Sequence, residues 1–165
     1  MKQKPLVTSK LDWYGEKITL EFFDSVSFER LCPVTQVQAV CFINENKIVL
    51  YKSGRGNYGC PGGTIEKGES FEEALAREIH EEVAGKMIVC GRIGYLKETR
   101  EKSGKVKYLL RYWVKIRLLD EAISDPCDDA RSRHVFKPEE AIDKLNWDEM
   151  GKLIIERARE NFLNS

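Results

Sequence analysis

The sequence lacks the features that would send the chain into a membrane or out of the cell. No apolar run approaches the roughly 20 residues that span a bilayer, and the opening segment MKQKPLVTSK is charged, without the apolar core of a signal peptide. Net charge is absent as well, because 27 basic and 27 acidic residues cancel. Because the chain has no strong overall electrostatic field, we expect it to bind neither a nucleic acid polymer nor a membrane. We also expect a cytoplasmic location.

Cysteine is sparse and unpatterned. The five cysteines are odd in number and form no CxxC pair, which favours a reduced setting over a disulfide framework. We expect Cys60 to fill an apolar position and not to act as a reactive thiol. Repeats, low-complexity segments and linkers are also missing. The 165 residues, with 42% hydrophobic content, predict a single domain over 1–165, in which 1–16 form either a flexible tail or an opening strand and turn.

What the chain does have is an acidic face on a predicted helix. The segment from Gly62 to Glu82, GGTIEKGESFEEALAREIHEE, enters a helix at Ser70. Glu78, Glu81 and Glu82 stand at i, i+3 and i+4, on one side of that helix. Carboxylates held so close repel one another by roughly half a kcal/mol per pair unless a cation lies among them.

A second stripe on this helix is apolar. Leu75, Ile79 and Val83 recur every four residues, so that face packs into a core and holds the neighbouring carboxylates rigidly. Oxygen ligands alone suit a hard divalent ion, Mg²⁺ or Mn²⁺. The alternative is a solvated acidic face paired with Arg77 and Lys86.

The glycine pair Gly62 and Gly63 lies upstream of the helix. Glycine lets backbone groups approach a ligand closely, and a glycine-rich turn before a helix N-terminus favours phosphate oxygens. A phosphate cradle and a metal site would then lie at two ends of one loop-helix unit. We therefore predict that Gly62 and Gly63 contact the substrate.

These residues resemble the Nudix box, G-x5-E-x7-R-E-U-x-E-E-x-G-U, in which U is a bulky aliphatic residue. Seven of its nine defined positions are filled, by Gly63, Glu69, Arg77, Glu78, Ile79, Glu81 and Glu82. The preceding YGCPG, residues 58–62, is similar to the aromatic-x-apolar-Pro-Gly lead-in of that family. The last glycine and aliphatic positions fall on Ala84 and Gly85, so we expect the helix to end one residue late, with Gly85 in the left-handed conformation.

The resemblance implies an α+β fold, a mixed β-sheet sandwiched between α-helices. It also implies a Mg²⁺-dependent hydrolase that cleaves the diphosphate of a nucleoside diphosphate linked to another moiety X, by attack of water on phosphorus. The implied metal ligands are Glu78, Glu81, Glu82 and the Gly63 carbonyl. Arg77 would orient a glutamate, and Glu69 would be structural. The partner is then a small nucleoside diphosphate derivative, and a homodimer is compatible with the sequence.

Two other functions stay open. A non-catalytic member that senses a ligand or binds a protein would usually have lost a box glutamate, and none is lost here. A generic acidic-helix interaction module would leave the glycine turn unexplained. X itself is not defined by the box, so oxidised nucleotides, ADP-ribose, dinucleotides and sugar nucleotides all remain candidates.

Around the box, the pattern predicts strands over 18–23, 35–43, 47–51, 87–97, 106–119 and 133–136, and helices from Pro138 and over 147–162. Residues 54–59 spell GxGxxG, but Cys-Pro-Gly-Gly follows instead of a helix, so a dinucleotide-binding fold is rejected. We predict a mobile loop there, from which Arg55 reaches a phosphate.

The strand over 106–119 has one apolar face, and Lys105, Arg111 and Trp113 lie on the other. The pattern favours a solvated cationic face. The alternative is that Arg111 or Trp113 contacts the phosphate or base of a substrate, and on that alternative Arg111 is a candidate substrate-binding residue.

The base that activates water lies outside the box in several families of this fold. The acidic stretch before the closing strand is the place to look, and Asp129 is our candidate, beside Asp128. Glu98 and Glu101, near the predicted hairpin, are the alternatives. If none of these serves, the base is a box glutamate.

Overall fold

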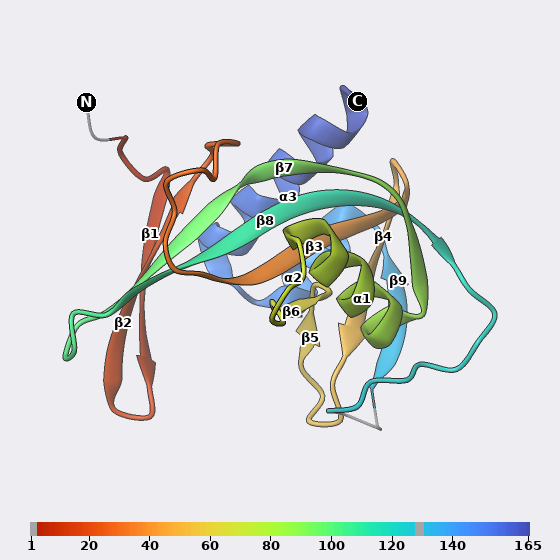
Figure 1. Cartoon of the computed structure of the whole chain (residues 1–165). Coiled ribbons are helices and arrows are strands. Elements are labelled where there is room, and N and C mark those ends of the chain that lie inside the picture. The colour runs from red at the N-terminus through yellow and green to blue at the C-terminus, as the bar shows by residue number, and fades with distance from the viewer. Residues whose placement is uncertain (1–2, 128–130) are drawn as a thin grey trace.

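The computed structural model describes residues 3–127 and 131–165, and these form nine strands and three helices (Figure 1). The strands are β1 (Val7–Trp13), β2 (Glu16–Phe23), β3 (Val34–Asn44), β4 (Lys47–Lys52), β5 (Tyr58–Gly59), β6 (Gly62–Thr64), β7 (Gly85–Arg100), β8 (Val106–Leu118) and β9 (Ser132–Phe136). The helices are α1 (Phe71–Val83), α2 (Pro138–Leu145) and α3 (Asp148–Leu163).

These strands form one mixed sheet. Its order is β1-β2-β7-β8-β3-β4-β5, with β6 beside β3 and β9 beside β4. β3 and β8 run parallel, with Gln38 opposite Arg111, whereas the other pairs are antiparallel. Because Gln38 also faces Gly62 across the β3–β6 pair, the glycine turn is fixed against the middle of the sheet.

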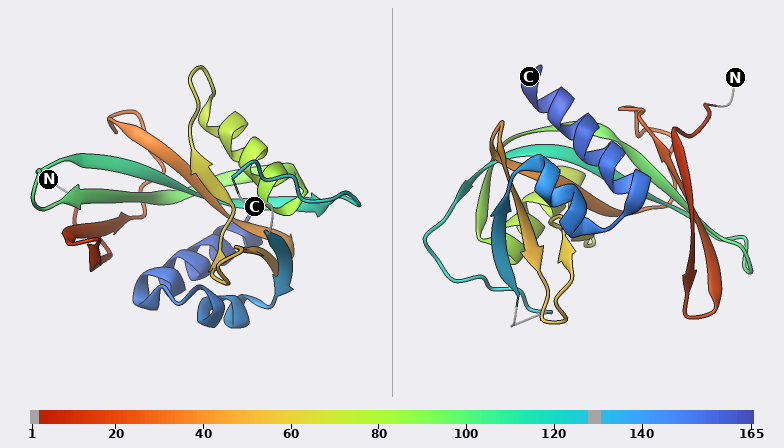
Figure 2. Two further views of the ribbon diagram at one scale, coloured as in Figure 1. Left: turned by 90° about the horizontal axis from the view of Figure 1, so that it is seen from below. Right: turned by 180° about the vertical axis from the view of Figure 1, so that it is seen from behind.

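Helices cover both faces of the sheet, and two cores result. On one face, α1 packs Leu75, Ile79 and Val83 onto the inward residues of β3 and β8. On the other face, α2 and α3 close a second core around Trp113 and Ile154 (Figure 2). The predicted α+β class, a mixed sheet sandwiched between helices, is confirmed.

The prediction of a solvated cationic face on β8 is wrong at its centre. Arg111 and Trp113 are 7% and 6% exposed, and Trp113 packs edge-on against Phe162 of α3 at a ring separation of 5.7 Å. Toward the end of the strand, Lys115 and Arg117 face solvent. One strand read alone does not reveal that a helix covers its second face.

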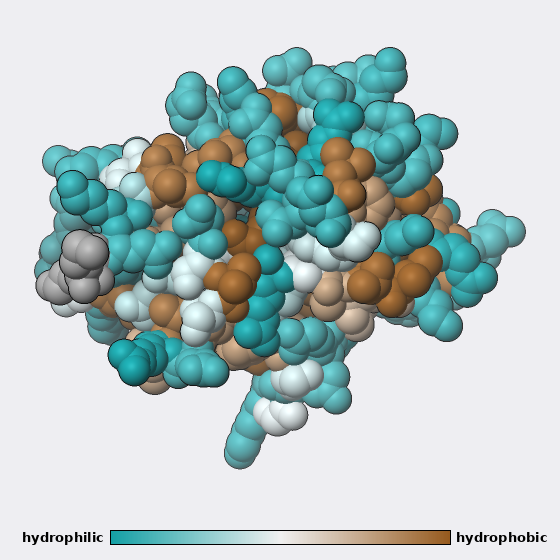
Figure 3. All heavy atoms as spheres, turned by 90° about the horizontal axis from the view of Figure 1, so that it is seen from above, coloured by the Kyte–Doolittle hydropathy of each residue, from teal (hydrophilic) through white to brown (hydrophobic). Residues whose placement is uncertain are grey.

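The N-terminal segment forms an opening strand and turn, the second of the two predicted alternatives. β1 pairs along its whole length with β2, and the turn between them places Tyr14 and Gly15 at positive φ. Trp13 and Tyr14 are exposed at the end of this hairpin. No helix among the described residues is long and apolar enough to cross a bilayer. The surface seen from above mixes hydrophilic and hydrophobic residues without one continuous apolar band (Figure 3).

Helix α1 ends at a residue other than the predicted one. Ala84, not Gly85, adopts the left-handed conformation, with φ 47° and ψ 49°, and its N–H donates to the carbonyls of Ile79 and His80. Gly85 instead opens β7, where a Cβ would press on the side chain of Ile79. A left-handed residue with a Cβ costs about 1–2 kcal/mol. The helix therefore ends at the position where the box has glycine, although this chain has alanine there.

We expect Ala84→Gly to leave the free energy of unfolding unchanged or to raise it by up to about 1 kcal/mol, because relief of left-handed strain offsets the lost methyl group. The same exchange at Ala76, in the middle of α1, should lower it by about 1 kcal/mol. Urea unfolding of the two variants checks this. Equal losses at both positions would contradict a strained helix exit.

Candidate active site

The loop-helix unit begins with a well-capped helix. The Ser70 hydroxyl accepts from the N–H of Glu73 at 3.2 Å, and the Glu73 carboxylate accepts from the N–H of Ser70 at 2.8 Å. This reciprocal pair is the capping box that an S-x-x-E sequence predicts. It fixes where α1 starts and hence which way each box residue points.

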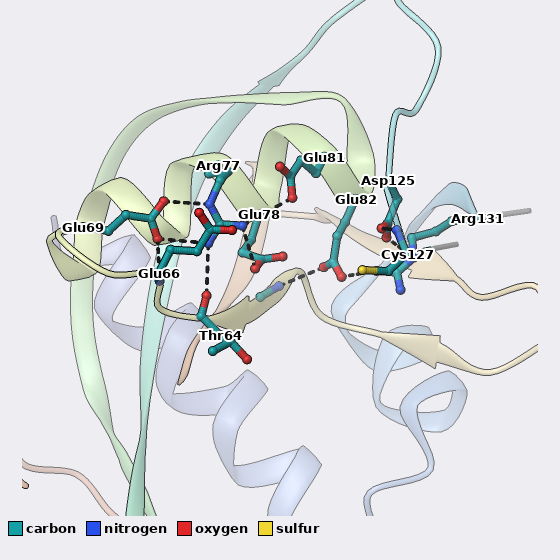
Figure 4. A network of polar contacts seen from close by, with 11 residues as sticks. Thr64, Glu66, Glu69, Arg77, Glu78, Glu81, Glu82, Asp125, Cys127 and Arg131 are labelled. Atoms are coloured by element: carbon teal, nitrogen blue, oxygen red, sulfur yellow. Dashed lines mark hydrogen bonds and ion pairs between the residues drawn. The ribbon is translucent and has the colours of Figure 1, made fainter. Parts of the chain in front are cut away.

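Arg77 is the centre of the polar network on α1 (Figure 4). Its Nε donates to Glu69 at 2.7 Å and its Nη2 donates to the carbonyl of Thr64 at 3.0 Å. Its Nη1 donates to Glu78 at 2.9 Å and to Glu81 at 3.3 Å. One guanidinium thus ties the loop after the glycine turn to two of the predicted metal ligands.

Glu69 braces the foot of this loop. Besides the bonds from Arg77, it accepts from the N–H of Glu66 at 2.9 Å. The hydrogen bonds from Arg77 and from the Glu66 backbone lower the pKa of Glu69 to about 2. Glu69 therefore faces Arg77 and its own loop.

This pKa predicts a stability change with pH. Because the pKa of Glu69 is lower in the folded state, its contribution is present above the ordinary value of 4.5 and is lost as the pH falls toward about 2. We expect wild-type stability to fall more steeply than that of Glu69→Gln between about pH 5 and about pH 3. Urea unfolding at successive pH values measures how the free energy of unfolding of each protein changes with pH. The same pH dependence in both proteins would contradict a stabilising role for the ionised Glu69 carboxylate.

The two glycines of the turn are required for different reasons. Gly62 has φ 156°, and a Cβ there would overlap the backbone of Val37 and Gln38 on β3. A Cβ on Gly63 would instead overlap the carboxylate of Glu78. The backbone at Gly63 and the Glu78 side chain are thus in direct contact, as expected if both serve one ligand.

Glu82 lies where the turn, α1 and the segment before β9 meet. Its Oε2 accepts from the N–H of Gly62 at 2.9 Å, and its Oε1 pairs with Arg131. Arg131 also pairs with Asp125 at 2.8 Å and lies over the ring of Tyr51, 4.1 Å from its centroid. Figure 4 shows Glu82 between the turn and this Arg131–Asp125 pair.

The carboxylates are held in a site that disfavours bare negative charge. Burial raises the pKa of Glu82 to about 7, and it also raises the pKa of Glu78. In this conformation Arg77 and Arg131 lie against the carboxylates, and no three metal-ligating side chains among the described residues come together closely enough to enclose an ion. The available donors are carboxylate oxygens and the backbone of a glycine, which has no Cβ to obstruct a ligand. Such oxygen donors nevertheless fit a hard divalent ion.

The predicted substrate residues lie in two places. Arg55 borders a shallow hollow with Ser53, Cys127 and Arg131, next to the pair that Arg131 forms with Glu82. Arg111 faces the opposite side of the sheet, where it lines a separate cavity under α3. Gly62 and Gly63 lie at the carboxylate cluster.

The alternative bases Glu98 and Glu101 are far from this cluster along the sheet. Glu98 lies opposite Leu20 of β2 and pairs with Lys107, whereas Glu101 contacts Thr19. Figure 1 shows their hairpin at the end of the sheet away from α1. The preferred candidate Asp129, and its neighbour Asp128, lie outside the described residues.

Sequence reasoning missed three contributors to the site, namely Tyr51, Asp125 and Arg131. Asp125 was noticeable only as one acid among several, and Arg131 only as a cation next to them. Their contacts depend on how residues 119–131 return to β9, which no periodic pattern specifies. Cys60 was predicted correctly as an apolar filler, because it is buried and burial raises the pKa of its thiol to about 12.

Comparison with known proteins agrees with this geometry. The family model described as NUDIX domain matches residues 34–156, three quarters of the chain. The chain therefore belongs to the Nudix hydrolase family, and the predicted resemblance is confirmed.

Solved structures share the fold at low identity. A pyrophosphohydrolase of Bacillus subtilis, BsRppH, superposes with a TM-score of 0.74 at 20% identity, covering 94% of this chain and 98% of that one. A structure from work on MutT of Aliivibrio salmonicida and Vibrio cholerae superposes with a TM-score of 0.56 at 18% identity, covering 78% of this chain and 98% of that one. An ADP compounds hydrolase superposes with a TM-score of 0.59 at 16% identity, covering 98% of this chain and 96% of that one. At such identities the likeness establishes the fold alone.

Proposed function

We propose that this Nudix hydrolase cleaves the diphosphate of a nucleoside diphosphate derivative, with Mg²⁺ or Mn²⁺ bound at the carboxylates of α1. The observation that carries the proposal is the contact between the Gly62–Gly63 turn and the carboxylates of Glu78 and Glu82. A phosphate-binding turn and a cation-binding cluster therefore meet at one point. The names of two solved relatives, a pyrophosphohydrolase and an ADP compounds hydrolase, support the same class of substrate.

The ion would be held by Glu78, Glu81, Glu82 and the Gly63 carbonyl. It would supply positive charge to the diphosphate oxygens and acidify the attacking water. Arg77 orients Glu78 and Glu81 through its own bonds to them, because Glu69 and Thr64 hold its guanidinium in place.

Two cations beside the cluster suit the phosphates. Arg55 is exposed and lines the same hollow as Arg131, which in turn pairs with Glu82. Arginine binds phosphate oxygens well through paired N–H donors. We assign Arg55 to phosphate binding. Arg131 is held by Asp125 and stacked on Tyr51, and thereby keeps a positive charge at this side of the cluster.

A panel assay tests the proposed reaction. The protein is incubated with Mg²⁺ and oxidised nucleotides, ADP-ribose, dinucleotides or sugar nucleotides, and product phosphate is released with a phosphatase and measured. We expect hydrolysis of at least one class, abolished by EDTA. Absence of hydrolysis across the panel with Mg²⁺ and with Mn²⁺ would favour a non-catalytic ligand-sensing or protein-binding member.

Asp129 stays our candidate for the general base. The described residues that flank it in the sequence, Asp125 and Arg131, take part in the network at Glu82. Loss of a general base costs about 10²–10⁴-fold in rate. We expect Asp129→Asn to lower kcat by at least about 10²-fold with Mg²⁺ affinity within a few-fold of wild type, and Asp120→Asn, an exposed control before β9, to leave kcat unchanged.

Steady-state kinetics with calorimetric Mg²⁺ titration separates the two effects. Little change in kcat for Asp129→Asn and for Asp128→Asn would overturn the assignment and make a box glutamate the base, with Glu78 the first candidate. A homodimer stays a prediction that gel filtration with light scattering would decide.

A further inference from the structure

Strand β1 is an end strand of the sheet, and its outer edge is regular. Among the described residues, only β2 pairs with β1, so the opposite edge of β1 has no neighbouring strand. Residues Val7–Trp13 pair with β2 without a register shift, and no proline interrupts them. Prolines and bulges are among the devices that keep such an edge from pairing with another chain. Figure 1 shows the β1–β2 hairpin standing out from the rest of the molecule, on the side away from β9. This edge can therefore accept a further strand.

The turn between β1 and β2 determines which backbone groups this edge presents. Its two residues, Tyr14 and Gly15, have φ of 52° and 81°, which is typical of the type I′ turn of a two-residue hairpin. In such a hairpin the residues that flank the turn exchange both backbone hydrogen bonds, and so does every second pair before them. The intervening residues of β1 therefore direct their N–H and C=O groups toward the open edge. These residues are Thr8, Lys10 and Asp12.

Exposed apolar side chains lie beside this edge. Leu11 is 44% exposed and Trp13 is 61% exposed. Both leave the face of the sheet that carries Ser9, because alternate residues of a strand share a face, and Ser9 and Leu11 lie near the start of α3. Apolar surface next to an unpaired strand edge is the arrangement through which chains associate.

The charges of β1 favour a second copy of the same strand as the partner. An antiparallel copy related by a two-fold axis at Leu11 places Lys10 of each chain opposite Asp12 of the other, which forms two pairs of opposite charge. Axes at Lys10 or at Asp12 would instead oppose two like charges directly. Opposite charges across a strand pair are stabilising, and like charges directly opposite are destabilising. The axis at Leu11 also brings together residues whose backbone groups point to the open edge, so hydrogen bonds form across it.

The present contacts of these two charged residues leave them accessible. The ammonium of Lys10 lies 3.5 Å from the carboxylate of Glu101, but the Lys10 side chain is 76% exposed. The Asp12 carboxylate accepts from the N–H of Gly15 at 2.9 Å and lies on the exposed hairpin, opposite Lys17 of β2. Exposed ion pairs of this kind are weak. Neither contact therefore prevents Lys10 and Asp12 from facing a second copy.

We propose that β1 pairs with β1 of a second copy, antiparallel and centred on Leu11, so that the two sheets become one continuous sheet. This inference concerns assembly and does not depend on the proposed reaction. On the face toward α3, Leu11 meets its own counterpart, and Trp13 lies opposite Ser9 of the second copy. Side chains that are exposed in the single chain then cover one another. Because a single strand of each chain forms the contact, we expect a reversible dimer with a small interface.

A charge exchange tests the pairing. Sedimentation equilibrium gives the dimer Kd of the wild-type chain, Lys10→Glu, Asp12→Lys and the control Lys115→Glu, an exposed lysine of β8. We expect wild type and the control to dimerise equally, and each of the other variants alone to show a Kd raised about tenfold or more. An equimolar mixture of Lys10→Glu and Asp12→Lys should dimerise as tightly as wild type, because every facing pair then has opposite charges. Such rescue cannot arise from variants that fail to fold.

Cysteine cross-linking tests the register. Residues opposite each other at a non-hydrogen-bonded position have Cα atoms about 4.5 Å apart, within the range of about 4.4–6.8 Å that a disulfide needs. Leu11→Cys should therefore form a covalent dimer on mild oxidation. Lys10→Cys should not, because the diagonal places its two copies about 7–8 Å apart. Wild type under the same oxidation measures the background from the exposed Cys32 and Cys127.

Three results would each overturn the inference. One is a wild-type chain that stays monomeric up to about 1 mM, where even weak association is detected; the edge would then be left to a different partner. Another is a mixture of Lys10→Glu and Asp12→Lys that dimerises no better than either variant alone. The third is equal cross-linking of Lys10→Cys and Leu11→Cys, which would show another register or another surface.

Discussion

Glu82→Gln is expected to lower kcat by about 10³-fold or more and to leave the fold intact. A metal ion contributes several kcal/mol of charge stabilisation to such a reaction, and each 1.36 kcal/mol is tenfold in rate. The amide keeps an oxygen that accepts from the N–H of Gly62, and Arg131 keeps Asp125 as its partner. The loss should therefore appear in turnover and not in melting temperature.

Glu72→Gln is the matched control for this result. It makes the same chemical change in the first turn of α1, where Glu72 accepts from the hydroxyl of Tyr112 and pairs with Arg92, away from the glycine turn. We expect its kcat to match that of wild type. Near-normal turnover in Glu82→Gln, measured on the substrate identified by the panel, would contradict a catalytic cluster on α1.

Gly63→Ala is expected to have the second largest effect. A Cβ at this position would overlap the carboxylate of Glu78, so the side chain must move away from the turn. Displacement of a catalytic group by about 1 Å can cost about 10²-fold in rate. Because Gly63 has no positive φ, the backbone itself tolerates alanine, and we expect turnover to fall by about that factor with a small change in stability.

Gly62→Ala provides the contrast. Its Cβ would meet the backbone of β3, which cannot move aside as a side chain can, so this variant should lose stability first. Melting curves and activity per folded molecule, measured on both variants, separate the two roles. Unchanged activity per folded molecule in Gly63→Ala, with a lower Tm, would make the turn purely structural.

The elements nearest the box were predictable because their signals are local. The capping pair of Ser70 and Glu73, the apolar stripe of α1 and the i, i+3, i+4 acids all lie within one helix, where 3.6-residue geometry determines which side chains meet. The same holds for β3, β4 and β8, whose long apolar runs gave their bounds to within one or two residues.

The rest depended on contacts between distant segments. The environment of Arg111 is set by α3, some forty residues further along the chain, so a strand pattern alone suggested solvent. The pairing of Glu82 with Arg131 depends on an irregular segment that returns to β9. The helix exit was misplaced because alanine rarely adopts the left-handed conformation that the position demands.

Divalent-ion binding tests the central claim most directly, namely that the carboxylates of α1 form the metal site. Mn²⁺ binding, followed by electron paramagnetic resonance, is compared for wild type, Glu78→Gln, Glu82→Gln and the control Glu72→Gln. We predict a site in wild type and in Glu72→Gln whose affinity falls about tenfold or more in each of the other two variants. Equal Mn²⁺ affinity in all four proteins would contradict the account.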